Sequence, residues 1–149
     1  MAQHSIRDDN TIYVSENPKG LEGVVVNTAP YPGFPTDLQA QLMSAMCIAN
    51  SDSYIKETIW ENRFMHVPEL CRMGANISLI DNTAHIIPVK QLSAAPVTAT
   101  DLRASFSLVM AGLVANGKTT ISRIYHLDRG YDKAVEKLSM CGAKIKRIS

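Results

Sequence analysis

The sequence contains an internal repeat, and this repeat limits the possible folds more than any other feature. The five residues Thr36–Ala40 recur with one change as Thr100–Ala104. Further along, Leu70–Ile77 recurs as Leu138–Ile145, with the same leucine, glycine, alanine and isoleucine in register. Self-similarity of this kind indicates one structural unit used more than once. The chain is therefore expected to fold as repeated units that pack on one another.

The first copy of the unit, residues 23–90, predicts the order strand, helix, strand, helix, strand, strand. Its first helix starts with Thr36 as N-cap, and Gln39 completes a capping box. Gly74 is expected to close the second helix in the C′ position. The predicted elements are strands at 23–28 and 53–59, helices at 38–49 and 64–73, and a hairpin formed by 77–80 and 84–87.

The second copy, residues 91–149, follows the same order but stops one strand short. It predicts a strand at 96–97, helices at 102–115 and 131–140, and strands at 119–124 and 143–148. Residues 1–22 are expected to hold the last strand of a preceding repeat, at 11–14, and a linker. The chain thus begins and ends inside the pattern, which predicts an α/β piece of a larger fold.

The composition excludes several classes of partner. The formal net charge is +1, so a nucleic-acid surface built on bulk charge is not expected. No run approaches the roughly 18 apolar residues of a membrane span, and the polar N-terminus does not resemble a signal peptide. The cysteines Cys47, Cys71 and Cys141 lack metal-ligand spacing and are expected to be buried thiols in a reducing cytoplasm. No metal site is predicted.

Three arginines suggest a local anion site. Arg103 lies in the first turn of a predicted helix, and Arg63 and Arg129 each precede one. Helix N-termini carry free N–H groups and a positive dipole end, so converging arginines there form a pocket for phosphate or carboxylate. The alternative is that each arginine pairs with a nearby acid, namely Glu61, Asp101 or Asp128.

Two aspartates occupy equivalent places in the repeats, since Asp37 follows Thr36 and Asp101 follows Thr100. An acid at a helix start favours the dipole and aids capping, so a structural role competes with a catalytic one for both. Trp60, at a predicted strand end, either lines a ligand cleft or fills the core.

Four ordered motifs carry a specific resemblance. They are Ala29–Gln41, Glu61–Leu70, Ala99–Ser105 and Arg123–Tyr131. Together they resemble the enolpyruvyl transferases that act on UDP-N-acetylglucosamine, over essentially the whole chain from about residue 27. The related transferase of the shikimate pathway is a weaker alternative, because the Glu61–Leu70 motif does not favour it.

The resemblance implies the first committed step of peptidoglycan synthesis. The enolpyruvyl group of phosphoenolpyruvate passes to the 3′-hydroxyl of UDP-N-acetylglucosamine, and phosphate is released, without a cofactor. The implied fold is an inside-out prism of βαβαββ units, of which this chain holds about two of the three in the C-terminal lobe. That agrees with the repeats found in the sequence.

The resemblance also assigns roles to site residues. It makes Asp37 the general base at the sugar hydroxyl and places Asp101 beside Arg103 and Arg129 to order the closed site. Arg103 and Arg129 would bind the phosphate and carboxylate of phosphoenolpyruvate.

Three further residues, Ile59, Trp60 and Arg63, would lie along the nucleotide-sugar cleft by the same resemblance. A phenylalanine is more familiar at the position of Trp60, and the change is expected to alter packing without abolishing binding.

The N-terminal lobe that completes this kind of site is not in the sequence. Because positioned charges act best in a closed, dry site, we expect no turnover by the chain alone. The alternative is a non-catalytic module that kept the fold for ligand or partner binding. An incomplete prism would also expose a sheet edge and an apolar face, which predicts self-association.

Overall fold

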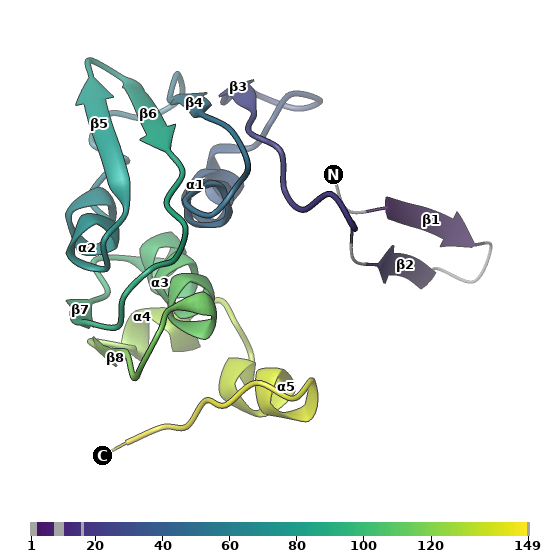
Figure 1. Ribbon diagram of the computed structural model, residues 1–149, viewed down its shortest axis with the longest axis vertical. Coiled ribbons are helices and arrows are strands. Elements are labelled where there is room, and N and C mark those ends of the chain that lie inside the picture. The colour runs from purple at the N-terminus through teal and green to yellow at the C-terminus, as the bar shows by residue number, and fades with distance from the viewer. Residues whose placement is uncertain (1–2, 8–10, 16, 149) are drawn as a thin grey trace.

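The computed structural model describes residues 3–7, 11–15 and 17–148, and Figure 1 shows their arrangement. The strands are β1 Gln3–Arg7, β2 Thr11–Ser15, β3 Val25–Asn27, β4 Ser53–Lys56, β5 Asn76–Ile80, β6 Thr83–Ile87, β7 Pro96–Thr98 and β8 Thr120–Ser122. The helices are the short 3₁₀ helix η1 Thr36–Leu38, α1 Gln39–Met46, α2 Val67–Arg72, α3 Leu102–Val114, α4 Tyr125–Asp128 and α5 Ala134–Met140.

The first repeat forms a four-stranded mixed sheet with the order β3-β4-β6-β5. Strand β3 pairs parallel to β4, with α1 in the connection, and β6 runs antiparallel to both β4 and β5. The turn between β5 and β6 is made by Asp81 and Asn82, with Asp81 in the left-handed region (φ 52°) that this turn favours. The predicted element order of this repeat and its hairpin are confirmed.

The second repeat starts in the same way and then departs from the prediction. Strand β7 pairs parallel to β8, and α3 connects them. The predicted helix at 131–140 begins later, at Ala134, because Lys133 adopts a left-handed conformation (φ 50°) that separates α5 from the unpredicted α4. The predicted strand at 143–148 is wrong: these residues have no sheet pairing within the described part of the chain. They run back along α5, where Ser139 donates a hydrogen bond to the Ile145 carbonyl.

A hairpin of β1 and β2 lies apart from the main body in Figure 1. The strand predicted at 11–14 is β2, and its partner β1 was not predicted from the sequence. The two strands are antiparallel, with Ile6 opposite Ile12.

The capping box predicted at Thr36 and Gln39 is wrong. Pro35 occupies the N-cap position of η1 and makes no side-chain cap, and the chain passes through η1 into α1. The Thr36 hydroxyl instead donates a hydrogen bond to Glu57 at 2.8 Å. A tertiary contact has therefore displaced the local capping rule. At the end of α2 the prediction holds, because Gly74 has the positive φ (88°) of a C′ glycine.

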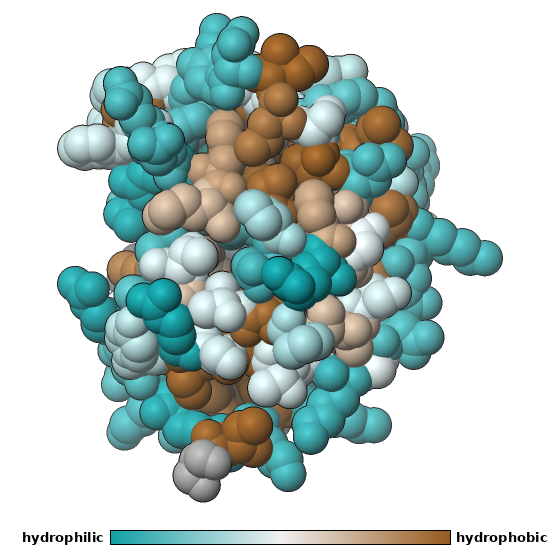
Figure 2. Space-filling model, turned by 90° about the vertical axis from the view of Figure 1, so that its left-hand side faces the viewer, coloured by the Kyte–Doolittle hydropathy of each residue, from teal (hydrophilic) through white to brown (hydrophobic). Residues whose placement is uncertain are grey.

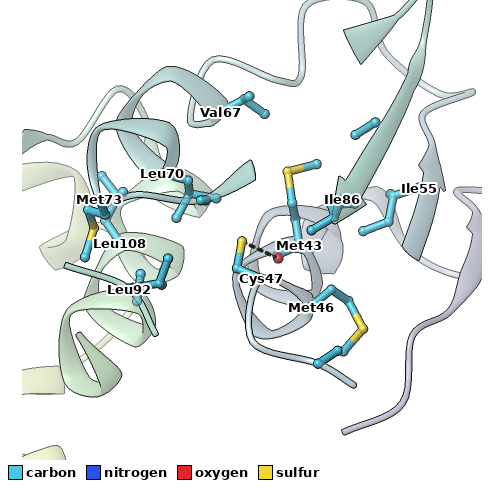
Figure 3. Packing of buried hydrophobic residues seen from close by; sticks show 14 of the residues in the cluster. Met43, Met46, Cys47, Ile55, Val67, Leu70, Met73, Ile86, Leu92 and Leu108 are labelled. Carbon is cyan, nitrogen blue, oxygen red and sulfur yellow. Dashed lines mark hydrogen bonds between the residues drawn. The ribbon is translucent and has the colours of Figure 1, made fainter. Parts of the chain in front are cut away.

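One hydrophobic core joins the sheet to the helices (Figure 3). Helix α1 contributes Met43 and Met46, and Cys47 follows directly after this helix. These three side chains face Ile55 and Ile86 of the sheet. Leu70 and Met73 from α2, Leu92 from the loop after β6 and Leu108 from α3 complete the same cluster. All of these side chains are at most 4% exposed, so the burial of their apolar surface holds both repeats together.

Helices α1 and α3, one from each repeat, approach closely because small residues meet between them. Ser44 of α1 donates a buried hydrogen bond to the Ser107 carbonyl of α3 at 2.9 Å. Ala40 and Ala104 are also fully buried or nearly so. The central helix of the first repeat therefore packs directly against the central helix of the second.

Two of the three cysteines contradict the prediction of buried thiols. Cys47 is buried, but Cys71 and Cys141, at the ends of α2 and α5, are exposed. Burial raises the pKa of Cys47 to about 12, with a smaller contribution from Cys71.

The face of the molecule on the β5 side carries apolar surface, seen as brown atoms in the upper part of Figure 2. Leu79 and Ile80 of β5 are 46% and 67% exposed. None of the helices in the described residues is long and apolar enough to cross a membrane.

Candidate functional site

Asp37 lies at the centre of a charged cluster built from three separate segments. Its carboxylate Oδ1 accepts a hydrogen bond from Arg103 Nε at 2.6 Å and lies 3.8 Å from Arg63 Nη1. The Asp37 side chain is 66% exposed, whereas those of Arg63 and Arg103 are 20% and 31% exposed. Two arginines thus converge on one exposed acid. They do not pair with the sequence neighbours Glu61 and Asp101 that were considered as alternatives.

Arg63 and Trp60 lie on the loop after β4. The Arg63 guanidinium carbon is 5.8 Å from the centroid of the Trp60 ring, which allows a cation–π contact. Asn62 between them has a left-handed backbone (φ 55°), a conformation that asparagine tolerates. The side chains of Trp60 and Arg63 both border the same opening.

A cavity of about 450 Å³ lies beside this loop. Trp60, 62% exposed, lies on its wall, so this tryptophan does not fill the core. Ile59 is half-buried, and its N–H is bound to Glu57. The cavity is lined by Glu57, Trp60, Glu61, Asn62, Arg63, Phe64, Met65, Leu79, Asp81 and Asn82.

Glu57 is a buried acid that the sequence reasoning missed. It is 3% exposed. Its Oε1 accepts hydrogen bonds from the Thr28 hydroxyl at 2.8 Å and from the Ile59 and Trp60 N–H groups at 2.9 and 3.2 Å, and its Oε2 accepts from Thr36. Burial by itself would raise the pKa of Glu57, but these donors outweigh it and hold the pKa below its usual value. Ser53 and Ile55 point into the core from β4, and Glu57 lies two residues further on, where the alternation of a strand predicts another inward side chain. This alternation is the one signal in the sequence that could have identified Glu57.

Asp101 has a different role from its repeat partner Asp37. It is the N-cap of α3, and its Oδ1 accepts hydrogen bonds from the Arg103 and Ala104 N–H groups at 2.8 and 3.1 Å. Asp101 therefore fixes the start of the helix that carries Arg103. The capping role considered for both aspartates holds for Asp101 and not for Asp37.

Arg129 stands apart from the cluster. It is the C-cap of α4 and not the residue before a helix start, so the predicted helix-dipole setting is wrong for it. Its side chain is exposed and makes no ion pair within the described residues. The neighbouring Asp128 pairs with Arg147 instead. The structure thus joins Arg63 and Arg103 to Asp37, whereas Arg129 has no ion pair with any described residue.

His66 is buried next to this region, at the N-cap position of α2. Its Nε2 has no hydrogen-bond partner among the described residues. Burial lowers the pKa of His66 to about 4, opposed by the nearby charge of Asp101 and a hydrogen bond with the Arg63 backbone. The ring is therefore neutral at neutral pH. Among the described residues, no cluster of three or more histidines, cysteines or acids is placed to hold a metal ion.

The fold matches solved enolpyruvyl transferases. The enolpyruvyl transferase NikO from Streptomyces tendae superposes with a TM-score of 0.87 at 30% identity, over 97% of this chain and 33% of that chain. An EPSP synthase from Acinetobacter baumannii gives a TM-score of 0.57 at 14% identity, over 80% of this chain and 29% of that chain, which shows the fold alone. The predicted α/β fold of enolpyruvyl transferases is confirmed.

Sequence comparison is more specific. Residues 2–138 match the family model described as EPSP synthase (3-phosphoshikimate 1-carboxyvinyltransferase), and the chain therefore belongs to this family. A UDP-N-acetylglucosamine 1-carboxyvinyltransferase from Rhodopseudomonas palustris (strain BisB18) is 61% identical over 142 residues, which are 95% of this chain and 33% of that protein. The protein of the same name from Granulibacter bethesdensis is 60% identical over 141 residues, again 95% of this chain and 33% of that protein. The resemblance carried by the four motifs is confirmed, and the chain spans about a third of the length of these curated relatives.

Proposed function

We propose that this chain supplies one wall of an enolpyruvyl transferase active site that acts on UDP-N-acetylglucosamine and phosphoenolpyruvate. The observation that carries the proposal is the convergence of Arg63 and Arg103 on Asp37, each from a different motif of the resemblance. The names of the relatives at about 60% identity support this substrate pair over the shikimate one. The reaction would belong to peptidoglycan synthesis in the cytoplasm.

The cluster has the groups that this chemistry needs. Arg103 presents a guanidinium at the first turn of α3, where the helix dipole adds positive potential for a phosphate or carboxylate. Asp37 is the counter-ion of Arg103 in the free chain, and an anionic substrate that takes over the arginine would release this carboxylate. Asp37 would then accept the proton of the sugar 3′-hydroxyl as that oxygen attacks C2 of phosphoenolpyruvate, while C3 takes up a proton from an acid on the missing lobe. Loss of phosphate from C2 together with a proton from C3 of the tetrahedral adduct would restore the double bond.

The other proposed residues support this centre in different ways. Asp101 accepts a hydrogen bond from the Arg103 N–H group and so fixes the position of Arg103. Trp60 and Arg63 line the cavity that would receive the nucleotide sugar, and Ile59 precedes them in the chain. Arg129, which makes no ion pair within the described part of the chain, would reach its anion only when both substrates and the second lobe are present.

The second wall of the site would come from an N-terminal lobe, so the chain alone should not turn over. Asp37 is 66% exposed, and water would screen every charge that the mechanism uses. The same exposure is compatible with a second candidate function. In that case the chain is a non-catalytic module that binds the nucleotide sugar or a partner without chemistry.

The test combines this chain with the separately expressed remainder of the Granulibacter bethesdensis relative, which supplies the N-terminal lobe and the part of the C-terminal lobe that this chain lacks. Phosphate release is measured from phosphoenolpyruvate with UDP-N-acetylglucosamine and, in parallel, with shikimate 3-phosphate. We expect release only with both lobes and the nucleotide sugar, and loss of release in Arg103→Ala. Arg72→Ala, which removes a surface arginine paired with Glu69, serves as the matched control. Binding of the nucleotide sugar without turnover, in the presence of a folded first lobe, would favour the module; turnover by this chain alone would refute the divided site.

A further inference from the structure

The two repeats use equivalent aspartates in opposite ways. In the second repeat, Asp101 turns its carboxylate inward and caps α3. In the first repeat the helix begins earlier, with Pro35 at the N-cap position, and Asp37 lies inside η1 with its carboxylate toward Arg103. Something in the first repeat must hold Asp37 away from the capping position.

The difference lies at the end of the central strand of each repeat. Asn27 pairs with Lys56 between β3 and β4, and Thr98 pairs with Ser122 between β7 and β8. Glu57 and Arg123 therefore follow equivalent strand ends. Only the first repeat has a carboxylate at this place, and its partner Thr28 is matched by Ala99, which has no hydroxyl.

The carboxylate of Glu57 holds two chain segments together. Through Oε2 it binds the hydroxyl of Thr36, the residue before Asp37. Through Oε1 it binds the backbone N–H groups of Ile59 and Trp60, which lead into the loop that carries Arg63. The segment of Asp37 and the segment of Arg63 are thus fixed to the same buried group.

We propose that Glu57 is a positioning residue that holds Asp37 opposite Arg63 and Arg103 by way of the Thr36 hydroxyl. Its geometric effect requires no ligand, whereas its importance for catalysis rests on the function proposed above. Buried polar groups that are fully paired fix a single arrangement, because a misplaced donor or acceptor in the interior is unfavourable. The ionised state of Glu57 is favoured by its hydrogen-bond donors, which lower its pKa although burial acts in the opposite direction.

Thr36→Val removes the hydrogen bond to Oε2 with little change in shape and leaves the bonds to Oε1 in place. Thr36→Ser keeps the hydroxyl and should rescue the arrangement. Thr119→Val is the matched control, since the Thr119 hydroxyl is buried without a partner in the described residues.

The readout is the ¹H–¹⁵N signal of Arg103 Nε–H, which reports its hydrogen bond to Asp37 in the ligand-free chain. In Thr36→Val we expect this signal to move toward the free-arginine position and lose protection from solvent exchange, while the Ile59 and Trp60 amide signals stay in place. Thr36→Ser and Thr119→Val should match the wild type. An unchanged Arg103 signal in folded Thr36→Val, or no rescue by serine, would overturn the proposal.

If Thr36→Val does not fold, Thr36→Ala removes the same hydroxyl with a smaller side chain and leaves Glu57 and its other donors in place. An Arg103 signal that stays at the wild-type position in folded Thr36→Ala would equally overturn the proposal. A chain that shows the expected shifts but never supports phosphate release would refute the proposed function and leave the positioning role intact.

Discussion

The opposite roles of Asp37 and Asp101 make a quantitative prediction about stability. Asp101→Ala removes two hydrogen bonds to the first-turn N–H groups of α3, at 2.8 and 3.1 Å. Loss of an aspartate N-cap typically destabilises a protein by about 1 kcal/mol, with a range of roughly 0.5–2. We expect the upper half of that range, because α3 is the longest helix in the described residues and packs into the shared core.

Asp37→Ala should behave differently. Its carboxylate is mostly exposed and caps no helix, and an exposed ion pair contributes about 1 kcal/mol at most. We expect the free energy of unfolding to stay within about 0.5 kcal/mol of the wild type. For a chain of this size, 1 kcal/mol corresponds to a change of about 2–4 °C in the melting temperature.

The assay is urea unfolding followed by circular dichroism for the two alanine variants and for Asp37→Asn and Asp101→Asn. Asparagine is as good an N-cap as aspartate, so Asp101→Asn should recover most of the lost stability, whereas both Asp37 variants should be close to the wild type. If Asp37→Ala lowers the urea midpoint as much as Asp101→Ala does, Asp37 has a structural role and the division of labour between the repeats is refuted.

Four further results are expected. His66 has a pKa of about 4 in the folded chain and 6.5 in the unfolded chain, so its contribution to stability is complete above pH 6.5 and is lost as the pH falls toward 4. Between pH 7.5 and pH 4, the urea midpoint of His66→Phe should therefore fall less than that of the wild type. Iodoacetamide should modify Cys71 and Cys141 in the native chain and Cys47 only after unfolding, as counted by mass spectrometry; labelling of all three in the native chain would contradict the buried position of Cys47. Gly23→Ala would place its Cβ 2.2 Å from a backbone carbonyl oxygen of the neighbouring segment, so a thermal melt should show a loss of about 1–3 kcal/mol. Light scattering should find the chain as a dimer or larger assembly, and a clean monomer would count against the exposed apolar surface as a contact.

The repeats predicted the fold because each copy contains its own local signals. Hydrophobic spacing and a C′ glycine at Gly74 were enough to place the elements of the first repeat. The predicted strand at 143–148 failed because a strand exists only where an edge is available to pair with it, and local sequence does not record the partner. Lys133 marked a helix boundary that no propensity scale reveals, since a left-handed lysine is rare.

The site was predicted in part for a similar reason. Motifs identified Asp37, Arg63 and Arg103, but the pairing of both arginines with Asp37 depends on three segments meeting in space. Glu57 was missed because its partners Thr28 and Thr36 lie 29 and 21 positions away in the chain. The capping rule applied to Thr36 failed for the same cause: a distant carboxylate competed for its hydroxyl.

The close approach of α1 and α3 has a consequence for how the molecule comes apart. In many repeat proteins each unit contacts only its neighbours through a separate interface, so units can open one at a time. Here the central helices of both repeats lie in one core and are joined by the hydrogen bond from Ser44 to Ser107. Gln41 of α1 also donates a hydrogen bond to Tyr131, which lies between α4 and α5 in the second repeat. Opening either repeat exposes the buried face of the other. The two copies should therefore exchange their slowest amide hydrogens with a common free energy and unfold as a single cooperative unit.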